Sequence, residues 1–176
     1  MSEESPTFGQ WLITGTWFVF TLICFVYLTF DRLIAFDPQD KLTNISPDVF
    51  QQKLVDINKD LLGIEPKKGI ILHFQQNDCA CNVSSEAHVN ALKELAQMHT
   101  VEFRNIDPTL IPDIVPSTPS VAILDDNGQL VYFGPYGEGL DCSQTDGFAL
   151  TVFNNYLKGF SASLLISDAE GCYCNI

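Results

Sequence analysis

The chain has 176 residues, a formal net charge of −13 at pH 7 and a pI of about 4.3. This charge repels the phosphate backbone of nucleic acids, and no cluster of Lys and Arg residues offers a basic face. We therefore expect no nucleic-acid partner. The length suits one domain of ordinary size with an additional segment.

An uncharged apolar run, WLITGTWFVFTLICFVYLTF, occupies residues 11–30. It is long enough to cross a bilayer core of about 30 Å as a helix. A buried core helix is the alternative, but such a helix is seldom apolar on every face over this length. A cleaved signal peptide fits less well, because no Lys or Arg precedes the run and no small-residue cleavage motif follows it. We predict a short tail at residues 1–10 and a membrane anchor at residues 11–30, in which Cys24 faces lipid or packs.

Two signals disagree about the side of the membrane on which the rest of the chain lies. Arg32 and Lys41 follow the anchor, whereas Glu3 and Glu4 precede it, and this charge bias favours a cytoplasmic domain. Five of the six cysteines also follow the anchor, and disulfides persist in oxidising compartments. Giving the cysteines more weight, we expect a single-pass inner-membrane protein with a periplasmic C-terminal domain.

The residues that follow the anchor predict a linker and then a domain. Residues 31–46 have no hydrophobic period and are predicted to be the linker, and residues 47–176 the domain. Ser46 and Pro47 suit the N-cap and first position of a helix that ends near Gly63. The apolar run GIILHF, residues 69–74, is typical of a buried strand.

The second half of the chain predicts a mixed sheet. After NDCACN, residues 77–82, an apolar face at helical spacing predicts a helix, and the alternating residues 101–107 predict a strand. Residues 120–134 form a predicted hairpin, residues 144–160 a last helix and residues 161–176 a tail. A strand–helix–strand unit pairs its strands in parallel, and the hairpin adds antiparallel strands. The predicted fold class is therefore α/β, with a mixed sheet flanked by helices.

Cys79 and Cys81 follow a predicted buried strand and open a helix, Thr118-Pro119 precedes a hairpin strand, and the hairpin ends in a glycine turn before a closing helix. In these three features, residues 66–160 resemble the thioredoxin-like superfamily. The chain is most similar to a poorly characterised branch of membrane-anchored bacterial members. Its C-x-C replaces the C-x-x-C of the superfamily.

This resemblance implies roles for individual residues. Cys79 is implied to be the attacking cysteine and Cys81 the resolving one. Pro119 is implied to be a cis-proline that shapes a peptide-binding face together with Thr118. Asn82 stands where the superfamily keeps its second cysteine.

Two further residues are candidates for the site, His73 from the resemblance and Tyr136 from its aromatic, glycine-rich surroundings. His73 stands where thioredoxins keep a buried carboxylate that handles a proton, and a histidine can do this near neutral pH. The alternative for His73 is a core histidine bonded to the backbone. Tyr136, in YFGPYGEG, is expected either to line a substrate groove beside Pro119 or to belong to a turn.

The cysteines leave several chemistries open. A helix N-terminus favours the thiolate form that attacks disulfides, and a Cys79–Cys81 disulfide would close a small, easily reduced ring. Cys142, Cys172 and Cys174 could form disulfides, or the tail cysteines could resolve a disulfide at Cys79–Cys81. A metal site is a further alternative, because the five thiols could gather to hold Cu, Zn or an iron–sulfur cluster.

We predict thiol–disulfide exchange on partner proteins, without a cofactor, as the function. The first alternative is a thiolate metal-binding or metallochaperone domain. The second is a non-catalytic domain in which the disulfides only stabilise the fold.

Overall fold

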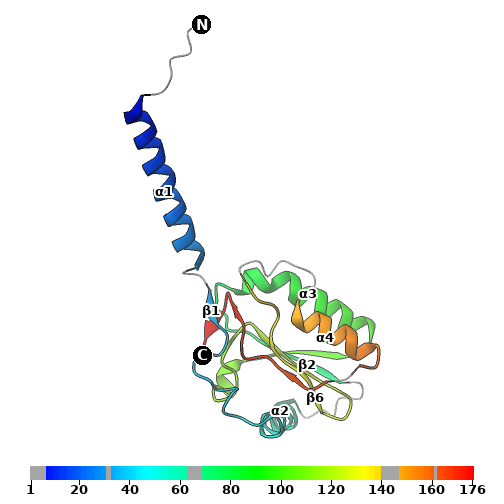
Figure 1. Ribbon diagram of the computed structural model, residues 1–176. Helices are drawn as coiled ribbons and strands as arrows, with labels where there is room; N and C mark the ends of the chain where they lie inside the picture. The colour runs from blue at the N-terminus through cyan, green and yellow to red at the C-terminus, as the bar shows by residue number, and fades with distance from the viewer. Residues whose placement is uncertain (1–6, 31–32, 63–68, 140–146, 161) are drawn as a thin grey trace. The chain divides into compact units, whose positions relative to one another are not determined.

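The computed structural model describes residues 7–30, 33–62, 69–139, 147–160 and 162–176 (Figure 1). These residues belong to two compact units that divide between Leu33 and Ile34.

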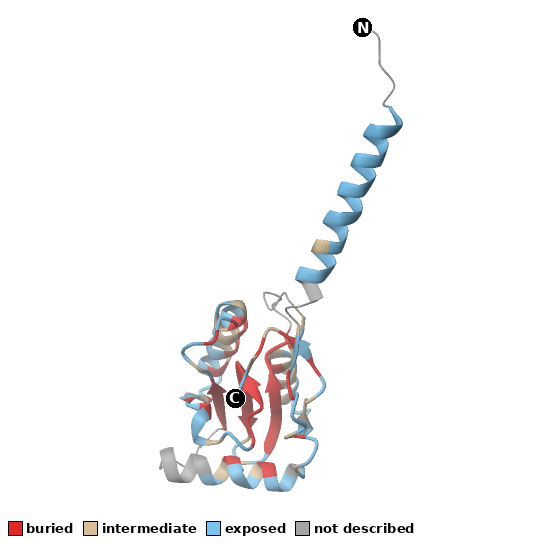
Figure 2. Ribbon diagram, turned by 90° about the vertical axis from the view of Figure 1, so that its left-hand side faces the viewer, coloured by how far each residue is buried: buried red, intermediate tan, exposed pale blue. Residues whose placement is uncertain are grey.

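The first unit contains one long helix, α1 (Phe8–Phe30). Its 23 residues extend about 35 Å at the usual rise per residue. The described side chains of α1 are exposed except for the partly exposed Cys24 (Figure 2). The segment Phe8–Leu28 is long and apolar enough to cross a membrane. The structure thus gives a single apolar N-terminal helix of the kind that the sequence predicts.

A five-stranded mixed sheet forms the centre of the second unit, in the order β3-β2-β5-β6-β7. The β2–β3 and β6–β7 pairs are parallel, whereas β2–β5 and β5–β6 are antiparallel. The predicted α/β class with a mixed sheet is confirmed. The strands of this sheet are β2 (Ile70–Phe74), β3 (Glu102–Ile106), β5 (Ser120–Leu124), β6 (Leu130–Pro135) and β7 (Leu164–Leu165).

Helices cover both faces of the sheet (Figure 1). α3 (Asn82–Met98) and α4 (Phe148–Leu157) share one apolar cluster with Ile71 of β2. α2 (Pro47–Leu62) lies on the other face, where it shares a second cluster with Leu72. Successive residues of a strand point to opposite faces, so one short apolar strand contributes to both layers of the core.

The segment expected to be a linker is partly built into the second unit. β1 (Ile34–Ala35) pairs antiparallel with β8 (Glu170–Gly171), and Phe36 and Leu42 are buried in the core. Asp37 organises the following turn, because its carboxylate accepts hydrogen bonds from the backbone amides of Lys41 and Leu42 at 2.9 and 2.7 Å. The segment has no helical or strand period because it packs through isolated apolar side chains.

The predicted tail also contains short strands. Besides β7 and β8, it forms β9 (Cys174–Asn175), which pairs antiparallel with β4 (Ser117–Thr118). β4 follows η1 (Pro108–Leu110), a turn of 3-10 helix, and leads into the Thr118–Pro119 peptide bond, which is cis. A two-residue strand is too short for an alternating pattern, so periodicity cannot reveal it.

Phe133 is the centre of the aromatic packing on the α2 face. Its ring centroid lies 4.5, 6.0 and 6.4 Å from those of Phe50, Phe74 and Phe36. We expect Phe133→Ala to lower the free energy of unfolding by about 3–5 kcal/mol, because it opens a cavity among these rings. Urea unfolding of the full chain in detergent measures this loss.

The matched control is Val83→Ala, because Val83 is 78% exposed. We expect the control to change the free energy of unfolding by less than about 0.5 kcal/mol. Equal losses for the two variants would contradict the central position of Phe133.

Candidate functional site

Cys79 and Cys81 lie in the turn that joins β2 to α3. Cys81 is the N-cap residue of α3, and Cys79 lies two residues before it. The turn is closed by backbone hydrogen bonds from Cys79 N to Gln76 O and from Asn82 N to Cys79 O, at 3.3 and 3.2 Å. The Asn82 side-chain amide also donates to Gln76 O at 2.7 Å. The sequence places both cysteines correctly, just before the helix.

The tail brings the second C-x-C motif to the first. Cys172 and Cys174 are separated by one residue, so in an extended segment their side chains point the same way. The β4–β9 register places Cys174 opposite Thr118, next to the cis peptide. Cys79 Sγ lies 3.7 Å from Thr118 O, so Thr118 and its strand partner Cys174 both lie next to this sulfur.

Two disulfides join the motifs. Cys79 Sγ is bonded to Cys174 Sγ at 2.09 Å, and Cys81 Sγ to Cys172 Sγ at 2.06 Å. The small Cys79–Cys81 ring considered from the sequence is not formed in this structure. Each cysteine is instead bonded to the tail, which is the arrangement expected if the disulfides tie the tail to the fold.

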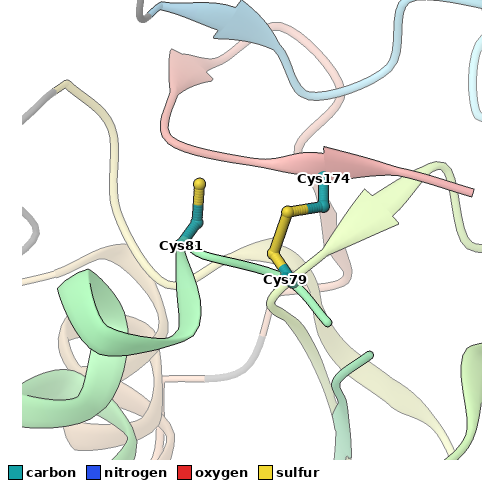
Figure 3. A group of neighbouring side chains, drawn as sticks. All are labelled: Cys79, Cys81 and Cys174. Carbon is teal, nitrogen blue, oxygen red and sulfur yellow. A yellow bond between two sulfur atoms is a disulfide. The ribbon is translucent and has the colours of Figure 1, made fainter. Parts of the chain in front are cut away.

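The sulfurs of the two disulfides are close to one another. The Sγ atoms of Cys79, Cys81 and Cys174 all lie within 4.8 Å of one another. Figure 3 shows Cys79 and Cys81 projecting from the start of α3 toward the strand that carries Cys174. A sulfur of one disulfide is therefore near both sulfurs of the other.

A cavity of about 530 Å³ borders the Cys79–Cys174 disulfide but not Cys81. Most of its lining residues are polar, and Asp78 and Asp107 give it acidic groups. Hydrogen bonds from the Thr109 hydroxyl and backbone amide, at 2.7 and 2.9 Å, hold the pKa of Asp107 below its ordinary value. The carboxyl is therefore ionised at neutral pH, and the cavity favours cationic groups.

His73 lies on β2, and both of its ring nitrogens are engaged. Nε2 is 2.9 Å from Gln75 Oε1, and Nδ1 is 2.8 Å from the hydroxyl of Tyr136. Gln75 Oε1 can only accept, so Nε2 carries the proton and Nδ1 accepts from Tyr136. Burial lowers the pKa of His73, which favours the neutral ring. His73 and Asn82 line a second cavity, which does not border Cys79. The role of His73 as a proton relay therefore stays a prediction.

The remaining predicted site residues are Tyr136, Thr118, Pro119 and Cys142, and they do not share one environment. Tyr136 is 2% exposed, so its side chain is part of the core and does not line an open groove. Thr118 and Pro119 lie beside Cys79, but strand β9 already pairs with the backbone at Thr118. Cys142 lies outside the described residues.

Several residues of the site were missed by sequence reasoning. Asn105 and Asp107, at the end of β3, line the cavity beside Cys79. Tyr173 is buried between the two tail cysteines, and its hydroxyl donates to Gly137 O at 2.6 Å. Asn105 and Asp107 could have been found from their position at the end of β3. This strand is parallel to β2, and parallel strands end at the same edge of the sheet, so polar residues there lie near Cys79.

The fold and the site define a class: a small α/β domain in which two C-x-C motifs cross-link a helix start to a tail strand. The family described as a domain of unknown function, DUF6436, matches residues 47–176. The chain belongs to this family, whose matched region contains both motifs. No curated protein and no solved structure matches the chain.

The two disulfides are nested, and this predicts non-additive effects on stability. Cys79–Cys174 and Cys81–Cys172 span 95 and 91 residues, so either one alone closes nearly the same loop. Replacing one pair by Ser should cost about 2 kcal/mol, because the other pair still closes the loop. Replacing both should cost about 5 kcal/mol or more, since the long loop is then opened.

Urea unfolding of the two double variants and the quadruple variant measures these losses in the full chain. The control is Cys24→Ser, which touches neither disulfide. A quadruple loss equal to the sum of the two double losses would show that the disulfides do not close a shared loop.

Proposed function

We propose that the protein is a membrane-anchored, thioredoxin-like thiol–disulfide exchange protein that acts on partner proteins from the periplasmic side. One observation carries this proposal: the Cys79–Cys174 disulfide borders an open cavity, and the sulfur of Cys81 lies beside it. Exchange needs an accessible disulfide and a nearby third sulfur, because a mixed disulfide is released by a second attack.

The oxidised chain would accept electrons from a partner dithiol. A partner thiolate entering the cavity attacks Cys79 Sγ, a new S–S bond forms, and Cys174 leaves as a thiolate. The second thiolate of the partner then attacks the partner sulfur of the mixed disulfide and releases Cys79. The partner gains one disulfide, and the chain gains two thiols after protonation.

Reduction of a partner disulfide would use Cys81. Both disulfides of the chain are first reduced by a small thiol such as glutathione, which is oxidised to its own disulfide, and the Cys79 thiolate then attacks a partner disulfide, forms a mixed disulfide and displaces one partner thiolate. Cys81 Sγ, within 4.8 Å of Cys79 Sγ, attacks Cys79 Sγ, so that a Cys79–Cys81 disulfide forms and the partner leaves as a dithiol after protonation. The N-terminus of α3 favours the thiolate at Cys81, its N-cap residue. In this proposal the edge of Thr118 and Pro119 receives the partner after the tail strand moves, and His73 handles a proton.

The anchor and the compartment are part of the proposal. The length and apolar surface of α1 support a membrane span, and both disulfides support an oxidising compartment. The nested, largely buried disulfides also favour a second function, a non-catalytic domain stabilised by its cross-links. Reactivity at Cys79 separates the two.

We expect Cys79 to be the sulfur that reacts with a partner. Two full-length variants in detergent are compared, one with Cys79 as the sole cysteine and one with Cys81 as the sole cysteine. After treatment with oxidised glutathione, mixed disulfides are counted by intact mass over time. The Cys79 variant should react at least about ten times faster, because Cys79 borders the cavity and Cys81 does not.

The unmodified chain should also reduce a disulfide-bonded peptide in the presence of glutathione, and Cys79→Ser should abolish this activity. Cys24→Ser is the control and should retain it. No activity in the unmodified chain, together with slow reaction at both cysteines, would favour the non-catalytic function.

The acidic cavity predicts a preference for cationic partners. A peptide with Lys residues flanking its cysteine should exchange with the Cys79–Cys174 disulfide faster than a peptide with Glu residues there. Replacing the two carboxylates of the cavity, Asp78→Asn with Asp107→Asn, should reduce the ratio of the two rates severalfold, and added salt should reduce it as well.

The matched control removes two exposed carboxylates that do not line this cavity, Asp56→Asn with Glu94→Gln. It makes the same change in net charge but should leave most of the preference intact. An equal fall in both double variants would assign the preference to the overall charge of the chain.

A further inference from the structure

The tail strand is held in place by contacts that do not involve sulfur. Tyr173 is 3% exposed, and its ring packs edge-on against Phe36 with centroids 5.2 Å apart. Its hydroxyl donates a hydrogen bond to Gly137 O. Because Tyr173 lies between Cys172 and Cys174, anchoring this ring fixes the position of both cysteines.

Strand pairing and hydrogen bonds hold the tail on both sides of Tyr173. β8 pairs with β1 before it, and β9 pairs with β4 after it. Ile176 N donates to Pro116 O at 3.1 Å, and Lys41 Nζ donates to Ile176 O at 3.1 Å. Reduction of the disulfides removes none of these contacts, so they favour a reduced state in which the four cysteines lie close together as thiols.

The reduced thiols would occupy a small, sheltered volume. Three sulfurs lie within 4.8 Å of one another, and Cys172 Sγ is bonded to one of them. Cys79 and Cys81 are only 6% and 7% exposed. In a tetrahedral zinc–thiolate site the Zn–S distance of about 2.3 Å places the ligand sulfurs about 3.8 Å apart. Reduction allows the bonded sulfurs, now 2.09 and 2.06 Å apart, to separate, and the sulfurs of Cys79, Cys81 and Cys174 already lie within 4.8 Å of one another, so side-chain rotations can bring the cluster toward that spacing.

We propose that the fully reduced chain binds one Zn²⁺ ion through Cys79, Cys81, Cys172 and Cys174. The site goes beyond the exchange function and does not rest on it, because it needs only the proximity of the four sulfurs. The four thiols lose their protons to solvent as their thiolates bind the ion, and no electrons are transferred in this step. The ion then restores the cross-link between the start of α3 and the tail that reduction removes.

The experiment uses the full chain in detergent, with Cys24→Ser and Cys142→Ser so that only the four proposed ligands remain. A phosphine reduces both disulfides; each disulfide takes up two electrons and two protons, and the phosphine leaves as its oxide with oxygen from water. After its removal under anaerobic conditions, Zn²⁺ is titrated in competition with a chromophoric chelator. We expect one Zn²⁺ per chain and a raised unfolding midpoint.

Cobalt and single substitutions test the ligand set. Co²⁺ in place of Zn²⁺ should give the visible bands of a tetrahedral site with sulfur-to-metal charge transfer. Cys172→Ser and Cys174→Ser should each weaken Zn²⁺ binding more than tenfold. Loss of a residue that only hydrogen-bonds to a ligand costs roughly tenfold or more, and loss of a ligand itself should cost more than that. Restoring Cys24 should change nothing.

The site would be overturned by less than one Zn²⁺ per chain, by cobalt bands that are not tetrahedral, or by unchanged affinity in Cys172→Ser. The oxidised chain, which has no free thiol among the four, should bind no Zn²⁺, and equal binding before and after reduction would also overturn it. Exchange activity is measured separately, so loss of one property does not decide the other.

Discussion

The antiparallel pairing of Thr118 with Cys174 determines where the sulfur chemistry of this protein is placed. It places Cys174 against the backbone beside the cis peptide. The one-residue spacing of the C-x-C motif then places Cys172 on the same side of the tail. Without this pairing, the cysteines before α3 could bond only to each other or to cysteines whose positions the fold does not fix. The two disulfides follow from a backbone register, and the buried ring of Tyr173 holds that register in place.

Most of the sheet and its helices can be predicted from the sequence because each element has a clear local pattern. β2 is a compact apolar run, and the β5–β6 hairpin surrounds a polar turn. Phe36 and Tyr173 show what such patterns miss. Each is a single apolar residue in a segment without a period, and each is buried only because a distant segment covers it.

The site was predictable in part for the same reason. The position of Cys79 and Cys81 before a helix is a local property, and sequence reasoning finds it. Their partners are a property of the tertiary fold, because Cys172 and Cys174 lie more than ninety residues away along the chain. Asp107 enters the site because β3 lies parallel to β2, which no pattern within its own segment reveals.

The nested disulfides also decide how the chain carries mechanical load. A pull applied between the segment before Cys79 and the residues after Cys174 passes directly through the outer S–S bond. The polypeptide between these cysteines, which contains α3, β3, β5 and β6, is thereby shielded from tension while the bond is intact. A machine that unfolds proteins by pulling on one end would therefore leave this polypeptide folded while the disulfides are intact, and reduction of both disulfides would expose it to the load.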